Sequence, residues 1–201
     1  MALNHPILEQ SFAVIDREMG DHALSPDEYA IVRRVIHSTA DFEFKDLVYC
    51  SPGAILGAIA ALRQQVPIVV DVNMVKYGIA SLVAKTFQNP IWVAVDEASE
   101  AEPGKTRTET GMIRCWEQAP QAMFVVGNAP TALLALCDRM AQSTMSPALV
   151  VAAPVGFISV LESKAAIAQL AVPQIRIEGR KGGSPAASAI VNALLVLASQ
   201  S

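Results

Sequence analysis

Short apolar runs alternate with longer segments of helical spacing along almost the whole chain, and this alternation constrains the fold more than any other feature. Most of the runs are continuously apolar, which is typical of strands buried on both faces. Strands that alternate with helices favour a parallel sheet. The runs are 47–49, 68–70, 91–95, 124–126, 149–151 and 175–177. We therefore predict a single α/β doubly wound domain over residues 1–201, with a mostly parallel sheet of about six strands and helices on both faces.

The segments between the runs carry helix signals. Ser25 and Glu28 have the spacing of a capping box, with Pro26 at the first helical position. Ser159 and Glu162 repeat the capping-box spacing, and we expect the same structure there. Two helices within residues 1–40 are expected to pack on the α/β core.

Composition excludes several classes of protein. A net charge of −4 and an aromatic content of 5% argue against a nucleic-acid-binding surface. No apolar run approaches the roughly 20 residues that span a bilayer, and we see no signal peptide. The three cysteines are widely spaced, which favours reduced thiols in a cytoplasm and offers no metal-binding spacing.

Polar residues and glycines gather where the predicted strands end. Doubly wound sheets bind ligands outside the carboxyl ends of their strands, so we expect these ends to face one crevice. An N-cap role is the structural alternative for the two aspartates. The ends are 50–52, Asp71, Asp96, 127–128, 154–156 and 179–181.

The loop from Gly179 to Ser184 is the most specific of these ends. Gly182 and Gly183 let the backbone approach a ligand closely, and amides before a helix favour anions. Arg180 and Lys181 add positive charge. The loop differs from a phosphate-binding P-loop because Lys181 precedes the glycine pair. A dinucleotide site is not supported either, because no Gly-x-Gly-x-x-Gly follows the first strand. We predict a carboxylate-binding loop; a turn with two solvated cations is the alternative.

His37 is the candidate for acid–base chemistry. It ends a predicted helix just before the first strand, and Arg34 lies three residues earlier on the same helix face. The alternative is a helix-end histidine that rests on the helix dipole. Arg107 begins its helix, where a cation is unfavourable to the dipole, and this suggests a ligand contact. The sequence contains no Gly-x-Ser-x-Gly nucleophile elbow, no His-Glu-x-x-His zinc motif and no Cys-x-x-Cys motif.

Five motifs, which occur in order over nearly the whole chain, resemble the precorrin-8X methylmutase family. The glycine-rich motif at 179–185 and the Gly-Asn-Ala-Pro-Thr motif are the most specific of them. The others include Glu162-Ser163-Lys164 after Pro154-Val155-Gly156-Phe157. The matching segments are 34–42, 71–75, 126–133, 154–164 and 179–185.

This resemblance implies an isomerase of cobalamin (vitamin B12) biosynthesis that moves a methyl group from C-11 to C-12 of a tetrapyrrole. It implies His37 as the acid, no dissociable cofactor, and a homodimer with the site near its interface. Substrate contacts are expected from Ser11, Arg34, Asp71 and Arg107 and from the loop residues Gly179, Arg180, Lys181, Gly182, Gly183 and Ser184. The sequence departs from the motif at Lys76, where many members carry arginine, and at Ala40, where some carry glycine. A tetrapyrrole carrier without catalysis and an α/β phosphotransferase are the rival interpretations.

Overall fold

A computed structural model describes residues 5–200; residues 1–4 and 201 of the expected domain lie outside this range. Within it, the strands are β1 (Val48–Cys50), β2 (Ile68–Val70), β3 (Ile91–Val93), β4 (Met123–Val126), β5 (Leu149–Ala152) and β6 (Gln174–Ile177). They form one sheet in the order β1-β6-β5-β4-β2-β3. All neighbours pair in parallel except β1, which is antiparallel to β6. The predicted α/β class and mostly parallel sheet are confirmed.

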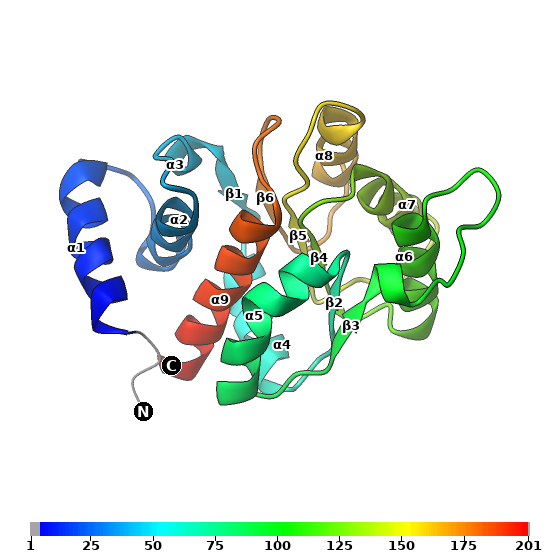
Figure 1. Cartoon of the computed structure of the whole chain (residues 1–201), viewed down its shortest axis with the longest axis horizontal. Coiled ribbons are helices and arrows are strands. Elements are labelled where there is room, and N and C mark those ends of the chain that lie inside the picture. Colours follow the sequence, from blue (N-terminus) through cyan, green and yellow to red (C-terminus); the bar gives the residue numbers. More distant parts are fainter. Residues whose placement is uncertain (1–4, 201) are drawn as a thin grey trace.

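Helices cover both faces of the sheet (Figure 1). They are α1 (Pro6–Met19), α2 (Pro26–Thr39), α3 (Phe44–Leu47), α4 (Ala54–Arg63), α5 (Asn73–Lys85), α6 (Arg107–Gln118), α7 (Pro130–Ala141), α8 (Val160–Ala168) and α9 (Ser184–Gln200), with a 3-10 turn η1 (Ala94–Asp96). One face carries α2, α4, α5 and α9, and the other carries α6, α7 and α8 (Figure 1). The long helix α9 packs between α2 and α5, and α1 packs on the outside of α2. None of the described helices is long and apolar enough to cross a membrane.

Successive strand residues point to opposite faces, which divides the core in two. Val70 and Val125 belong to the cluster beneath α2, α4, α5 and α9, whereas Val69 and Phe124 belong to the cluster beneath α6, α7 and α8. All four side chains are fully buried. Continuously apolar strands are therefore required here, because both faces of each strand must exclude water.

The strand order reverses between β2 and β4, which is where a doubly wound sheet opens a crevice at its carboxyl edge. Asp71 follows β2 and Gly127 follows β4 at this point. The segment 50–52 does not join them. Because β1 runs antiparallel to β6, Ser51 lies beside Gln174 at the start of β6, on the opposite edge of the sheet. The expectation that all six strand ends face one crevice is wrong for this segment.

Local signals predicted two helix starts, but only one of the two expected capping boxes is formed. The capping box of Ser25 and Glu28 is formed as expected. The box at Ser159 is not formed, because Ser159 has a left-handed backbone (φ +57°) and its side chain caps no helix N–H. A cap residue needs an extended backbone to aim its oxygen at the helix. The third strand is also shorter than predicted, since it ends at Val93 and continues as η1.

Candidate active site

His37 lies exposed near the end of α2 and lines a groove of about 310 Å³ between α1 and α2. The groove is lined by Ser11, Val14, Ile15, Glu18, Ile36, His37, Ala40 and Phe42. Ser11 donates its hydroxyl to the carbonyl of Ile7, 3.0 Å away, which holds the side chain against α1. The structure thus brings together two residues that are far apart in sequence, Ser11 and His37, both expected to serve the substrate.

The buried ring of Phe12 supports this groove from α1. It contacts the His37 ring edge to face, and the guanidinium carbon of Arg34 lies 5.9 Å from its centre. Arg34 and His37 therefore share the helix face that was predicted from their spacing. Burial, with a smaller contribution from the neighbouring Arg33, lowers the pKa of Arg34. Arg33 points elsewhere and pairs with Asp16 at 3.0 Å.

The glycine-rich loop lies beside the end of α2. Lys181 bridges to the carboxylates of Asp41 at 2.5 Å and Glu43 at 2.7 Å, both in the segment that follows α2. Hydrogen bonds to these two groups raise the pKa of Lys181. The Ser38 hydroxyl also donates to the carbonyl of Pro185, 3.4 Å away. These contacts place the predicted anion loop next to the helix turn that carries the candidate acid.

Arg180 and Lys181 differ in their partners. Within residues 5–200, the exposed guanidinium of Arg180 forms no ion pair, whereas the charge of Lys181 is already compensated. A ligand carboxylate would therefore meet Arg180 directly, while Lys181 would have to exchange one of its carboxylates for the ligand.

The backbone of the loop depends on its glycines. Gly179, Gly182 and Gly183 all have positive φ, at +69°, +150° and +106°. A β-carbon on Gly182 would lie 2.4 Å from the carbonyl oxygen of Ala153, so no larger residue fits there. Ser184 follows as the first residue of α9 and is buried.

Asp71 has no exposed surface, so its side chain cannot contact a ligand in this structure. Its two carboxylate oxygens each accept two backbone N–H groups, at 2.6–3.1 Å. The donors are Val72, Gly127, Asn128 and Ala129, the last of which caps α7. Burial raises the pKa of Asp71, and the four N–H groups oppose that rise. The expected substrate contact is thus replaced by a role in fixing the crevice between β2 and β4, and Val72, not Asp71, caps α5.

Arg107 begins α6, as predicted, but on the opposite face of the sheet from His37. Its guanidinium donates to the carbonyl of Ala98 at 3.1 Å and to that of Val95 at 2.9 Å. These bonds tie the segment after β3 to α6 and offset the unfavourable dipole at the helix start. Asp96 nearby accepts from the Asn73 amide at 2.9 Å and is likewise not a helix cap.

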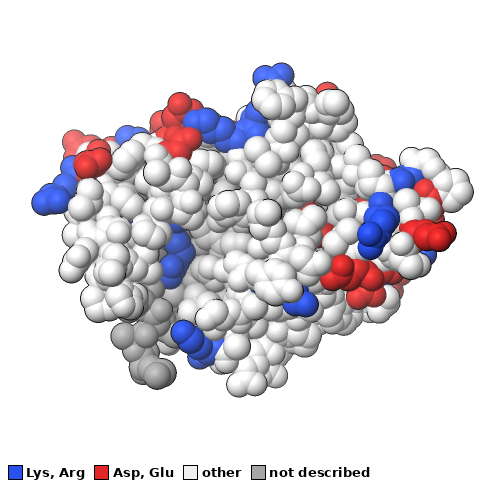
Figure 2. Space-filling model, in the orientation of Figure 1, with Lys and Arg blue, Asp and Glu red and all other residues white. Residues whose placement is uncertain are grey.

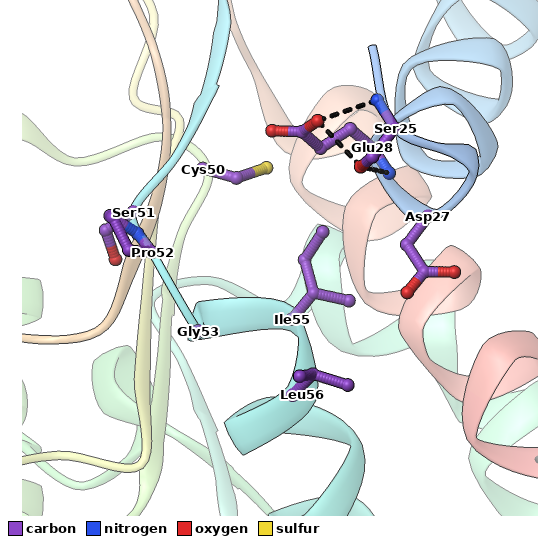
Figure 3. Close-up of a pocket in the computed structure, with 9 residues that line it drawn as sticks. All are labelled: Ser25, Asp27, Glu28, Cys50, Ser51, Pro52, Gly53, Ile55 and Leu56. Carbon is purple, nitrogen blue, oxygen red and sulfur yellow. Dashed lines mark hydrogen bonds between the residues drawn. The ribbon is translucent and has the colours of Figure 1, made fainter.

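A second groove, of about 320 Å³, lies at the opposite edge of the sheet, between the start of α2 and the β1–α4 turn (Figure 3). The thiol of Cys50 points toward Glu28 across this groove (Figure 3). Burial, together with the charge of Glu28, raises the pKa of Cys50 to about 12, so the thiol stays protonated. Glu28 is already engaged in the capping box of α2. This groove offers no reactive group to complement His37.

The face in Figure 2 is hollowed in the middle, and the surface of the hollow is almost entirely uncharged. Basic side chains lie at its left side and along its upper edge (Figure 2). In the part of the chain that the structure describes, no cluster of three or more histidine, cysteine or acidic side chains is placed to hold a metal ion. A doubly wound α/β fold with an exposed histidine, a glycine-rich loop that carries two cations and an uncharged hollow is typical of an enzyme-like domain.

Comparison with known proteins identifies the family. The model of the precorrin-8X methylmutase family matches residues 6–197. A cobalt-precorrin-8 methylmutase from Synechocystis is 58% identical over 98% of this chain and 97% of its own, and a precorrin-8X methylmutase from Sinorhizobium is 32% identical over 94% and 92%. The crystal structure of a precorrin-8X methylmutase from Thermus thermophilus superposes with a TM-score of 0.88, at 40% identity and 98% coverage of both chains. The chain belongs to this family and is a methylmutase, an isomerase of cobalamin biosynthesis.

Sequence reasoning missed one residue that shapes the site. Lys164, noted only as part of a family motif, is buried beneath the glycine-rich loop and donates to two of its carbonyls. Its position in the helix was a usable signal. The buried residues of α8 are Val160, Ser163, Lys164 and Ile167, and a lysine on a buried helix face needs a specific partner.

Proposed function

We propose that this enzyme moves a methyl group from C-11 to C-12 of precorrin-8X or cobalt-precorrin-8, giving hydrogenobyrinic or cobyrinic acid, with His37 as the acid that assists the shift. The observation that carries this proposal is the position of His37, exposed in the groove that also holds Ser11 and adjoins Arg34. The family membership and the names of the related methylmutases supply the substrate class.

The reaction suits such a site because a 1,5-sigmatropic shift needs little covalent help. The bond from the methyl carbon to C-12 forms as its bond to C-11 breaks, and no electrons are lost or gained overall. His37, donating a proton or a hydrogen bond to a ring nitrogen, would draw electron density from the macrocycle and ease the migration. The rest of the site has to hold the macrocycle in one geometry.

The cations around the hollow are proposed to bind the acetate and propionate groups of the substrate. Arg180 is exposed and forms no ion pair within residues 5–200, and Arg34 lies beside the acid. Lys181 would exchange Asp41 or Glu43 for a ligand carboxylate. Arg107 is proposed as a further anchor, with the guanidinium donors that Val95 and Ala98 leave unused. A protein of net charge −4 can bind an anion where its cations cluster.

We further propose that the protein acts as a cytoplasmic homodimer without a dissociable cofactor, with the site near the subunit interface. Val14 and Phe42, which line the His37 groove, are 42% and 38% exposed. A second subunit that covered these side chains would enclose the groove and exclude water from the acid.

The test compares the wild type with His37→Ala, with His22→Ala as the control, because His22 stacks on Tyr29 away from the groove. Each protein is mixed with cobalt-precorrin-8, and the corrin product is followed by its visible spectrum. We expect the wild type and His22→Ala to form product, and His37→Ala to bind the substrate without rearranging it. Normal turnover by His37→Ala would refute its role as the acid. Binding without turnover by the wild type would favour the carrier interpretation.

A further inference from the structure

Lys164 places a buried cation directly beneath the glycine-rich loop. Only 2% of the residue is exposed, and its Nζ donates to the carbonyl of Gly179 and to that of Lys181, each at 2.7 Å. Burying an ammonium group is costly unless it is well paired, so the position of this lysine needs an explanation. No ion pair of Lys164 occurs among the described residues; its partners are the backbone of one loop.

We propose that Lys164 is a positioning residue for the substrate, because it holds the loop from Gly179 to Ser184 in the conformation that presents Arg180 and the loop amides to the ligand. The claim that this restraint aids substrate binding rests on the proposed function. Because Lys164 is buried and its ammonium faces the loop carbonyls, we expect it to act on binding and not on the chemical step.

The loop geometry supports this role. The carbonyls of Gly179 and Lys181 both turn inward to the ammonium, while the carbonyl between them, that of Arg180, accepts from Gly156 at 3.4 Å. On the far side, the N–H of Gly183 donates to Ala153 at 2.8 Å. With its glycines at positive φ, this backbone has few restraints of its own, and Lys164 supplies two of the strongest.

The charge of Lys164 also favours the binding of carboxylates at the loop. Burial lowers its pKa to about 8, and the nearby carboxylate of Glu178 opposes that effect. Glu178 is itself paired with Arg176 at 2.7 Å. On the loop lie Arg180 and Lys181, and the charge of Lys181 is compensated by Asp41 and Glu43. At neutral pH the ammonium therefore adds positive potential beneath a loop that is expected to bind carboxylates.

The experiment uses Lys164→Met, which keeps the apolar stem and removes the charged donor. Lys85→Met is the matched control, because Lys85 is an exposed lysine in the last turn of α5. The rate of trypsin cleavage after Arg180 and Lys181, measured without ligand, shows how firmly the loop is held in its conformation. Calorimetric titration with cobyrinic acid gives the Kd, and single-turnover kinetics at saturating cobalt-precorrin-8 give the rate of the bound substrate.

We expect Lys164→Met to be cleaved in the loop at least about tenfold faster than the wild type. Its Kd should rise about 10- to 100-fold, which corresponds to the loss of charged hydrogen bonds, while the single-turnover rate stays within about twofold. Lys85→Met should match the wild type in all three measurements. Lys164→Arg, which restores a cationic donor, should recover part of the affinity.

Unchanged cleavage in Lys164→Met would refute the restraint on the loop. Faster cleavage with an unchanged Kd, or a fall in the single-turnover rate alone, would refute the role in substrate positioning. If the wild type does not bind cobyrinic acid, the proposed function and the claim about substrate binding fail together, while trypsin still tests the restraint on the loop. Should Lys164→Met not fold, Lys164→Gln replaces it in the same comparison.

Discussion

The rings of Phe12 and His37 lie 5.7 Å apart between their centres and at 77° to each other. Phe12 belongs to α1 and His37 to α2, so the packing of one helix on the other restricts the orientation of the candidate acid. Arg33 lies over the same ring at 4.3 Å and pairs with Asp16 of α1. The N-terminal helix, which contributes nothing to the sheet, therefore takes part in building the site.

Phe12→Leu should disturb this orientation. We expect it to lower kcat about tenfold with a smaller change in KM, since the acid loses an aromatic contact while the anchors remain. It should also reduce stability by about 1–2 kcal/mol, because Phe12 is buried. Phe124→Leu, in the core beneath α6 and α7, is the control for that stability loss. Equal kinetic effects in the two variants would show that Phe12 acts only through stability.

Asp71→Asn should destabilise the protein by about 3 kcal/mol, measured by urea unfolding at pH 7. Both oxygens of Asp71 accept backbone N–H groups, so an amide would turn a donor toward two of those donors. Asp96→Asn is the matched control at another predicted strand end, because Asp96 is exposed and accepts only from Asn73 among its described neighbours. Similar losses of stability in the two variants would contradict the role assigned to Asp71.

Lys164 should make stability depend on pH in alkaline solution. Its pKa of about 8 lies below the ordinary value of 10.5, so between these values the unfolded chain holds a proton that the folded protein has released. The free energy of unfolding should therefore rise with pH across this window, by about 2 kcal/mol for this residue. Urea unfolding of the wild type and Lys164→Met at pH 7 and pH 9.5 tests whether the free energy of unfolding rises with pH because of Lys164. A wild type that loses stability relative to the variant over this range would contradict it.

Gly182→Ala and Gly179→Ala should differ strongly although both residues have positive φ. The new methyl group at position 182 would collide with the carbonyl of Ala153, whereas the one at position 179 would meet no atom within 4 Å. We expect Gly179→Ala to cost about 1 kcal/mol and Gly182→Ala at least about 3 kcal/mol, with a loss of cobyrinic acid binding. Thermal unfolding and calorimetric titration check both values, and equal behaviour of the two variants would show that the loop shifts to relieve the collision.

Much of the site was visible in the sequence because local spacing fixes which residues share a face. The three-residue separation of Arg34 and His37 predicted their common helix face, and the glycines after β6 predicted an unusual backbone. The roles of Asp71 and Lys164 were not predictable in this way. Three of the four partners of Asp71 lie more than 50 residues away, and those of Lys164 lie in the loop after β6. No local pattern specifies such contacts.

Hydrophobic periodicity over a few residues was sufficient to predict the alternation of strands and helices, the buried faces of the strands and the α/β class. The antiparallel pairing of β1 with β6, which moves Cys50 and Ser51 away from the crevice, depends on long-range contacts that no local pattern specifies. Strand direction and order depend on which long-range pairings bury the most surface and satisfy the backbone, and an edge strand can satisfy both in either direction. The same long-range packing placed Phe12 against His37 and Lys164 beneath the loop.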